Sequence, residues 1–261
     1  MGPGVHKEEV SLLQVRRPPR EFRRHDLVDI SEEGRRESAW QAWDAKGLLK
    51  VDSWPSPSVR SHSKRVLEHG LQGVYLPGIV RRVTDRDIDS ARELYGEISG
   101  DDYIAIGFVI PFTPESRRIR VPCVLHHKCV TRRITPEQVA EMRFSPRTPA
   151  LAALSVMKES VKDRIKLGVW GSVALEIYTG LPYTDGGSDL DVILEGVSVE
   201  DVADMAKLAD RLEECFSVRV DIEVQLKEGW GVNARELLSG RDTILVKGIR
   251  EVKLARREAF L

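Results

Sequence analysis

The chain has 261 residues, enough for two modest domains that each bury a core. Its 40 lysines and arginines nearly balance 41 aspartates and glutamates, so it lacks the polycationic character typical of proteins that bind nucleic acid or membrane surfaces. Three cysteines suggest no disulfide framework, no apolar run approaches the length that spans a bilayer, and the start, MGPGVHKEEV, has no apolar signal stretch. We therefore expect a cytoplasmic protein that binds neither a membrane nor nucleic acid.

The first 146 residues combine a basic arm with a small α+β domain. Residues 1–23 are rich in arginine around Pro18 and Pro19, which predicts a flexible arm that is either a solvated tail or an anion-binding segment. A domain over residues 24–146 follows. Its expected elements are a helix over residues 31–47 with Ser31 as N-cap, a loop over WPSPS (54–58), strands over 73–83, 101–112 and 116–127, and a helix over 85–98.

The segment FSPRTPA, residues 144–150, is polar and carries two prolines, so we expect it to link the first domain to a second one over residues 147–261. The expected elements of the second domain are helices over 151–165, 171–180 and 198–216, and strands over 167–170, 188–194 and 217–226. Gly180 would end the second helix, and Ser198 with Asp201 resembles a capping box. The sequence thus predicts an α+β protein whose second domain has a mixed sheet with helices.

Acidic residues alternate inside two of these apolar strands. Residues two apart on a strand share a face, so Asp189 and Asp191 point the same way, as do Asp221 and Glu223. If the two strands are neighbours, the carboxylates converge and repel one another unless a cation is present. Unpaired carboxylates of this kind suit Mg²⁺, which completes its coordination with water and phosphate oxygens.

A Gly-Ser turn stands between the strand over 167–170 and the next helix. Glycine lets the backbone approach a ligand closely, and the first N–H groups of the helix, with the Ser172 hydroxyl, can bind phosphate. A metal on one side and a phosphate site on the other suit phosphoryl transfer by in-line displacement. Each motif alone is a weak signal, but their combination at consistent positions favours this chemistry.

These motifs resemble the nucleotidyltransferase superfamily of the polymerase-β type through Gly171-Ser172, Asp189-Leu190-Asp191 and Asp221. More closely, GSVALEIYTGLPY followed by SDLDVIL resembles the malonate decarboxylase holo-acyl-carrier-protein synthases, which are phosphoribosyl-dephospho-CoA transferases. Further segments that look similar are Arg24 to Leu27, Ile79 to Arg82, Gly107 to Pro111, Arg117 to Ile119, Ala234 to Leu237 and Leu245 to Lys247. The resemblance runs from about Arg24 to Lys253, and Ile222 departs from it by standing where we expect a glycine.

The resemblance implies transfer of phosphoribosyl-dephospho-CoA from 2'-(5''-triphosphoribosyl)-3'-dephospho-CoA to a serine of the apo acyl-carrier subunit of malonate decarboxylase, with release of diphosphate. The implied catalytic residues are Asp189, Asp191 and Asp221. The implied Mg²⁺ ligands are Asp189 and Asp191 with Asp221 or Glu223, of which Asp221 is favoured. The residues expected to bind substrate near the metal are Gly171, Ser172 and Ser188. Two alternatives stay open: another Mg²⁺-dependent nucleotidyltransferase that acts on a protein, small molecule or RNA end, and a non-catalytic nucleotide-binding module.

Basic residues of the first domain are the other candidates for substrate binding. Arg81, Arg82 and Arg117, followed by Arg118, either bind the phosphates of a CoA-like ligand or lie at solvated strand ends. His25 either orients substrate or has a structural role. A zinc site is not favoured for four residues that lack paired C-x-x-C spacing: Cys123, His126, His127 and Cys129.

Overall fold

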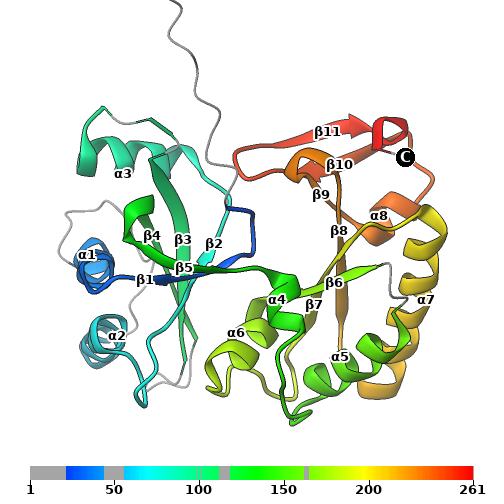
Figure 1. Ribbon diagram of the computed structural model, residues 1–261, viewed down its shortest axis with the longest axis horizontal. Helices are drawn as coiled ribbons and strands as arrows, with labels where there is room; N and C mark the ends of the chain where they lie inside the picture. Colours follow the sequence, from blue (N-terminus) through cyan, green and yellow to red (C-terminus); the bar gives the residue numbers. More distant parts are fainter. Residues whose placement is uncertain are drawn as a thin grey trace, which may run out of the picture.

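The computed structural model describes residues 22–43, 56–97, 99–100, 102–111, 118–161 and 165–260. Their strands form two sheets, each with its own helices (Figure 1). The α+β class predicted from the sequence is confirmed. No helix in these ranges is both long and apolar enough to cross a membrane.

The first sheet is antiparallel throughout, with the strand order β4-β3-β2-β1-β5. Its elements are β1 (Leu27–Ile30), α1 (Glu32–Trp43), α2 (Pro57–His69), β2 (Gly78–Val80), α3 (Asp85–Tyr95), β3 (Tyr103–Ile110), β4 (Ile119–His126) and β5 (Val130–Ile134). The alternation predicted for β4 is confirmed, because Ile119, Val121, Cys123 and Leu125 are all buried. The intervening residues of β4 therefore face away from this core.

The second sheet is mixed and has the order β11-β10-β9-β8-β7-β6. Its strands are β6 (Lys166–Trp170), β7 (Leu190–Glu195), β8 (Val220–Gln225), β9 (Gly231–Asn233), β10 (Thr243–Lys247) and β11 (Val252–Arg256). Its helices are α4 (Pro136–Ala140), α5 (Pro149–Ser160), α6 (Gly171–Thr179), α7 (Val199–Phe216) and α8 (Ala234–Leu238). Only β7 and β8 pair in parallel among the described strands, and α7 is the long crossover between them.

Local signals fix two of these helices as predicted. Gly180 ends α6 with a left-handed backbone (φ 72°), and its N–H donates to the carbonyl of Glu176. The Ser198 side chain accepts from the N–H of Asp201, whose own side chain accepts from the N–H of Ser198, so the predicted capping box opens α7. Both helices therefore start and stop where their sequence directs, which fixes the lengths of the turns that lead into β7 and β8.

A helix begins where the sequence analysis expected a loop. Pro57 and Ser58, the last residues of WPSPS, form the first turn of α2, so the prediction is wrong at these positions. The Ser56 side chain accepts a hydrogen bond from the N–H of Val59, and Pro57 occupies the first helical position, where its missing N–H costs nothing. Ser-Pro is thus a helix start here.

Two other predicted elements are shorter than expected. The strand predicted over residues 73–83 is confined to Gly78–Val80. The helix predicted over residues 151–165 starts earlier, at Pro149, and ends at Ser160; Ile165 is buried just before β6. Ile165 matches the helical spacing of α5 although it lies beyond the end of that helix, because it packs on the core from the segment before β6.

The segment that leaves the first sheet packs on the second. Helix α4 lies within residues 24–146, the predicted first domain, yet it contacts β6, and a Cβ on Gly168 would stand 2.7 Å from the Cβ of Pro136. Glycine at 168 therefore lets α4 approach the strand. Of the predicted arm over residues 1–23, only the last two residues are described, and Arg23 forms ion pairs with Glu137 at 2.8 Å and Glu195 at 3.3 Å.

Candidate functional site

A cavity of about 1190 Å³ is lined by residues of both sheets. The first sheet supplies residues of β2, β3 and β4, and the second supplies the turn from β6 to α6 and the loop before β7. Two carboxylates line the cavity, those of Asp189 and Asp191. Its cationic lining residues are Arg24, Arg81, Arg82, Arg118, Arg120 and Lys247. The cavity thus has an acidic end and many basic groups, which suits an anionic ligand with a bound metal ion.

The acidic end is built by the two parallel strands. Asp191 on β7 stands in register with Asp221 on β8, and Asp189 comes directly before β7. Burial and then the charges of Asp221 and Asp189 raise the pKa of Asp191 to about 7. The cations Arg219 and Arg120 act in the opposite direction. The sequence prediction that these carboxylates converge across neighbouring strands is therefore met by the fold.

The Gly-Ser turn lies against one of these carboxylates. Gly171 has φ +71°, and a Cβ built on it would stand 2.5 Å from Oδ2 of Asp191. Both the left-handed backbone and the close approach require glycine. No side chain caps the start of α6 at Trp170, so the first N–H groups of that helix, including that of Ser172, can donate to an anion.

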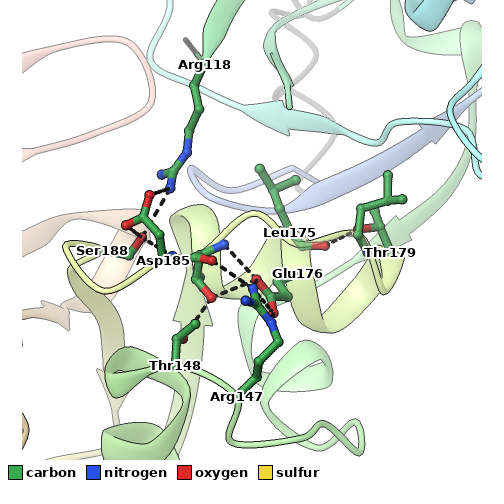
Figure 2. A network of polar contacts seen from close by, with 10 residues as sticks. Arg118, Arg147, Thr148, Leu175, Glu176, Thr179, Asp185 and Ser188 are labelled. Atoms are coloured by element: carbon green, nitrogen blue, oxygen red, sulfur yellow. Dashed lines mark hydrogen bonds and ion pairs between the residues drawn. The ribbon is translucent and has the colours of Figure 1, made fainter. Parts of the chain in front are cut away.

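A polar network holds the loop between α6 and β7 (Figure 2). Glu176 on α6 accepts hydrogen bonds from the N–H of Thr184 at 2.6 Å and from its hydroxyl at 2.7 Å, and it pairs with Arg147 at 2.8 Å. Arg147 also donates to the carbonyl of Thr184, and the hydroxyls of Thr148 and Thr184 are 2.8 Å apart. The loop between α6 and β7 is therefore fixed to α6 near the middle of the loop, at Thr184.

The same loop is bonded to the first sheet at its far end. Ser188 donates to Asp185 at 3.0 Å, and Arg118, next to β4, donates to Oδ2 of Asp185 at 2.9 Å and to the Ser188 hydroxyl at 3.2 Å (Figure 2). The N–H of Gly187 and then the Ser188 hydroxyl lower the pKa of Asp185. This bridge joins the two walls of the cavity directly beside Asp189.

Glu223 is engaged by cations of the first domain. Arg24 donates to both of its carboxylate oxygens, at 3.2 and 3.1 Å, and both side chains are nearly buried. Arg24 also donates to Nε2 of His25, which makes that nitrogen an acceptor because a guanidinium has no acceptor atom. The imidazole lies on the Trp170 indole, with 3.9 Å between ring centroids, and burial lowers its pKa.

The donor set at the acidic end fits Mg²⁺ when phosphate and water complete the coordination. Among the described residues, no group of three or more His, Cys, Asp or Glu side chains is placed so that it could hold a metal ion. Mg²⁺ does not need one, since it usually takes one or two protein carboxylates. Burial and then the like charges of Asp221 and Asp189 raise the pKa of Asp191, and a bound cation would relieve the repulsion among these carboxylates. Glu223 is already neutralised by Arg24, which leaves Asp189 and Asp191, the two carboxylates in the cavity lining, as the better ligands, with Asp221 in register beside Asp191.

The other predicted site residues are distributed as follows. Gly171, Ser172, Ser188, Asp189 and Asp191 line the cavity together with Arg81 and Arg82, whereas Asp221 and Glu223 lie on β8 outside its lining. The guanidinium of Arg81 is held within the first domain, since it pairs with Asp87 and donates to the carbonyl of Ile106 at 3.0 Å. Arg117 lies outside the described residues.

Three cavity cations were not among the predicted site residues: Arg24, Arg120 and Lys247. Alternation could have found Arg120, because it stands between the buried Ile119 and Val121 and must share a face with Arg118. Arg24 and Lys247 lie in segments that resemble the family, but no local pattern places them at the site, since they reach the cavity through tertiary packing.

Comparison with known proteins identifies relatives along most of the chain. A family model described as the C-terminal domain of phosphoribosyl-dephospho-CoA transferase MdcG matches residues 137–258. A phosphoribosyl-dephospho-CoA transferase of Bradyrhizobium diazoefficiens is 28% identical over 253 residues, which cover 94% of this chain and 93% of the relative. Proteins of the same name from Xanthomonas axonopodis pv. citri and Pseudomonas aeruginosa are 26% and 30% identical, over 58% and 46% of this chain and 71% and 57% of the relatives. No solved structure matches.

The matched region contains every predicted metal ligand and the Gly-Ser turn, and the full-length alignment adds the domain that supplies most of the cavity's arginines. The predicted resemblance is therefore confirmed, and with it the prediction of an enzyme: the chain is similar to proteins named phosphoribosyl-dephospho-CoA transferase, which are transferases.

Proposed function

We propose that this protein transfers phosphoribosyl-dephospho-CoA from triphosphoribosyl-dephospho-CoA to a serine of the apo acyl-carrier subunit of malonate decarboxylase. The names of its relatives supply the transferred group. The observation that carries the proposal is the pairing of Asp191 with Asp221 on adjacent parallel strands, with Gly171 against the Asp191 carboxylate. This arrangement places Asp191 beside a phosphate site in one corner of the cavity, with Asp221 next to it just outside the cavity lining.

In the proposed reaction the serine hydroxyl of the carrier attacks the α-phosphorus of the triphosphate. A new oxygen–phosphorus bond forms, the bond between the α-phosphorus and the bridging oxygen to the β-phosphate breaks, and diphosphate leaves with the electron pair. Asp221 takes the serine proton, with its Oδ1 held by the amide of Asn233 at 2.6 Å. Gly171 and Ser172 hold the departing diphosphate through backbone N–H groups and the Ser172 hydroxyl.

Asp189, Asp191 and Asp221 are the proposed ligands of Mg²⁺. The ion would neutralise negative charge on the phosphate oxygens as the transition state forms. The cavity's arginines act in the same direction by attracting the polyphosphate. Without a metal ion, the carboxylate cluster would repel the polyphosphate. This explains why the carboxylates occur together with the cavity's arginines.

The experiment is the intact mass of a purified apo carrier subunit after incubation with this protein, Mg²⁺ and triphosphoribosyl-dephospho-CoA. We expect a gain equal to one phosphoribosyl-dephospho-CoA group, and loss of that gain with the Asp189→Asn variant. The matched control is Asp242→Asn, because Asp242 is also an exposed aspartate but does not line the cavity.

A folded wild-type protein that leaves the carrier mass unchanged contradicts the proposed substrate pair. Nucleoside triphosphates with other acceptors would then be tested as the alternative. Equal transfer by the Asp189→Asn variant contradicts the proposed ligand set while leaving the substrates in place.

A further inference from the structure

An apolar patch lies on the wall of the cavity that the first sheet supplies. We call it the sheet patch and define it by Ile79 on β2, Gly107 on β3 and Pro122 on β4. Gly107 pairs in register with both of the others, so the three residues stand side by side across the sheet. All three line the cavity. Pro122 lies between the buried Val121 and Cys123 and so faces away from the core of the first domain.

Among the described residues, no close contact requires the glycine at the centre of the sheet patch. Gly107 has no left-handed backbone, and the nearest described atom to a Cβ built on it is Cδ of Arg81, at 3.8 Å, an ordinary contact distance. The contrast is Gly78 on the neighbouring strand, where a Cβ would stand 2.7 Å from Cδ1 of Ile106. Glycine inside a strand weakens the strand, and one setting in which it occurs is the close approach of a ligand.

Cations stand beside the sheet patch on the same face of β4. Arg118 and Arg120 alternate with buried residues and therefore point to the same side as Pro122. Both line the cavity, and Arg120 lies close enough to Asp191 to attract its carboxylate. The sheet patch is thus an apolar surface with guanidinium groups between it and the acidic end of the cavity.

We propose that the sheet patch seats the adenine base of the dephospho-CoA part of the donor, and that Arg118 and Arg120 bind the diphosphate attached to that nucleoside. This inference rests on the proposed function and names the part of the cavity that recognises the donor. A planar base needs a flat apolar surface without a side chain at its centre, and Gly107 flanked by Ile79 and Pro122 provides one. The diphosphate needs planar cationic donors, which the two arginines supply.

The base and the reacting triphosphate then occupy different walls of one cavity. The triphosphate lies at the Gly-Ser turn of the second domain, and the base lies on the first. Recognition of the dephospho-CoA part is therefore separated from the phosphoryl-transfer chemistry, so a substitution on one wall can be tested without altering the other.

The decisive variant is Gly107→Val. Valine favours strands and its Cβ has room, so we expect a melting temperature equal to or above that of the wild type. Its two methyl groups would cover the centre of the sheet patch, so the dissociation constant for 3′-dephospho-CoA, measured by calorimetry, should rise at least about tenfold. Binding of 4′-phosphopantetheine, which lacks the base, should change little. Thr243→Val is the control, because Thr243 is an exposed strand position away from the cavity.

A second variant, Arg120→Gln, tests the same site from the exposed rim, where folding is not at risk. It should weaken 3′-dephospho-CoA binding and reduce the salt dependence of that binding. Unchanged affinity for 3′-dephospho-CoA in both variants overturns the inference. So does a Gly107→Val variant that raises the KM for the carrier protein and not for the donor, because the sheet patch would then seat the acceptor.

Calorimetry separates this inference from the proposed function, because binding of 3′-dephospho-CoA requires no transfer. Asp189→Asn should bind 3′-dephospho-CoA as the wild type does. Binding that depends on Gly107 in a protein that transfers nothing to the carrier keeps the sheet patch and refutes the proposed reaction. Full transfer with Gly107→Val at unchanged donor KM keeps the reaction and refutes the sheet patch.

Discussion

The strongest consequence of the carboxylate cluster concerns stability, and Asp191→Asn tests it. In the metal-free protein, burial and the neighbouring charges of Asp221 and Asp189 raise the pKa of Asp191 from its ordinary 3.8 to about 7. Between these two pH values the folded state retains a proton that the unfolded state has released. Stability therefore falls as the pH rises through this range, and the loss is complete above about pH 7.

The magnitude follows from the size of that change. A rise of about three units in the pKa of Asp191, at about 1.4 kcal/mol for each unit, gives an upper limit of roughly 4 kcal/mol for the loss of stability. Partial exposure and solvent screening lower this loss to about 2 kcal/mol. Asparagine carries no charge at any of these pH values, so Asp191→Asn removes the penalty. At pH 8 we expect the variant to be more stable than the wild type by about 2 kcal/mol, or roughly 4–8 °C in melting temperature. Near pH 4 the two proteins should melt together.

The assay is thermal unfolding of both proteins in a chelator at several pH values from 4 to 8, with Asp242→Asn as the exposed control. Mg²⁺ is then added at pH 8. It should raise the melting temperature of the wild type, because binding to the folded state alone stabilises it, and should raise that of Asp191→Asn much less. A variant that is less stable than the wild type at pH 8, or a difference that does not change with pH, would refute the reasoning.

Three further substitutions test other parts of the site. Gly171→Ala should lower the free energy of unfolding by about 1–2 kcal/mol and kcat by at least about tenfold, because the alanine methyl group would collide with the Asp191 carboxylate. Thermal melting measures the first effect, and the rate of mass gain on the carrier measures the second. Glu176→Gln should weaken the network that holds the loop before β7 and lower kcat by about tenfold with little change in melting temperature. Glu223→Gln should cost about 3 kcal/mol of stability by leaving Arg24 nearly buried and unpaired, while calorimetry finds unchanged Mg²⁺ affinity.

Much of the fold over residues 166–225, which carries the proposed metal ligands, could be predicted from local sequence because its signals are local. The alternation of apolar residues in β8, the glycine at the end of α6 and the capping box of α7 each fix an element without help from distant residues. The strand β9 could not be predicted in this way, because its three residues, GVN, are set by pairing with β8 rather than by their own composition.

The residues of the candidate site also fall into those that local sequence predicts and those that only the tertiary structure reveals. Asp189 and Asp191 were accessible to sequence reasoning because period-2 alternation places both on one face and apolar neighbours exclude a surface turn. The role of Glu223 was not accessible to sequence reasoning. Asp221 and Glu223 are two residues apart, like Asp189 and Asp191, but the partner of Glu223, Arg24, comes from the other end of the chain. Only the tertiary contact shows that one acidic residue of the strand is neutralised and the other is not.

The distribution of charge explains why the second domain does not form this cavity alone. Among the described residues, it contributes both carboxylates and the Gly-Ser turn but only one of the lining cations, Lys247, whereas the arginines come from the preceding part of the chain. A polyanion approaching the second domain alone would meet mainly repulsion from its carboxylates. The bridge from Arg118 to Asp185 and the ion pair of Arg24 with Glu223 hold the arginine wall over that acidic end. The proposed metal ligands and the arginines proposed to attract the donor therefore come from different parts of the chain, and the contacts between these parts decide whether the cavity accepts an anionic substrate.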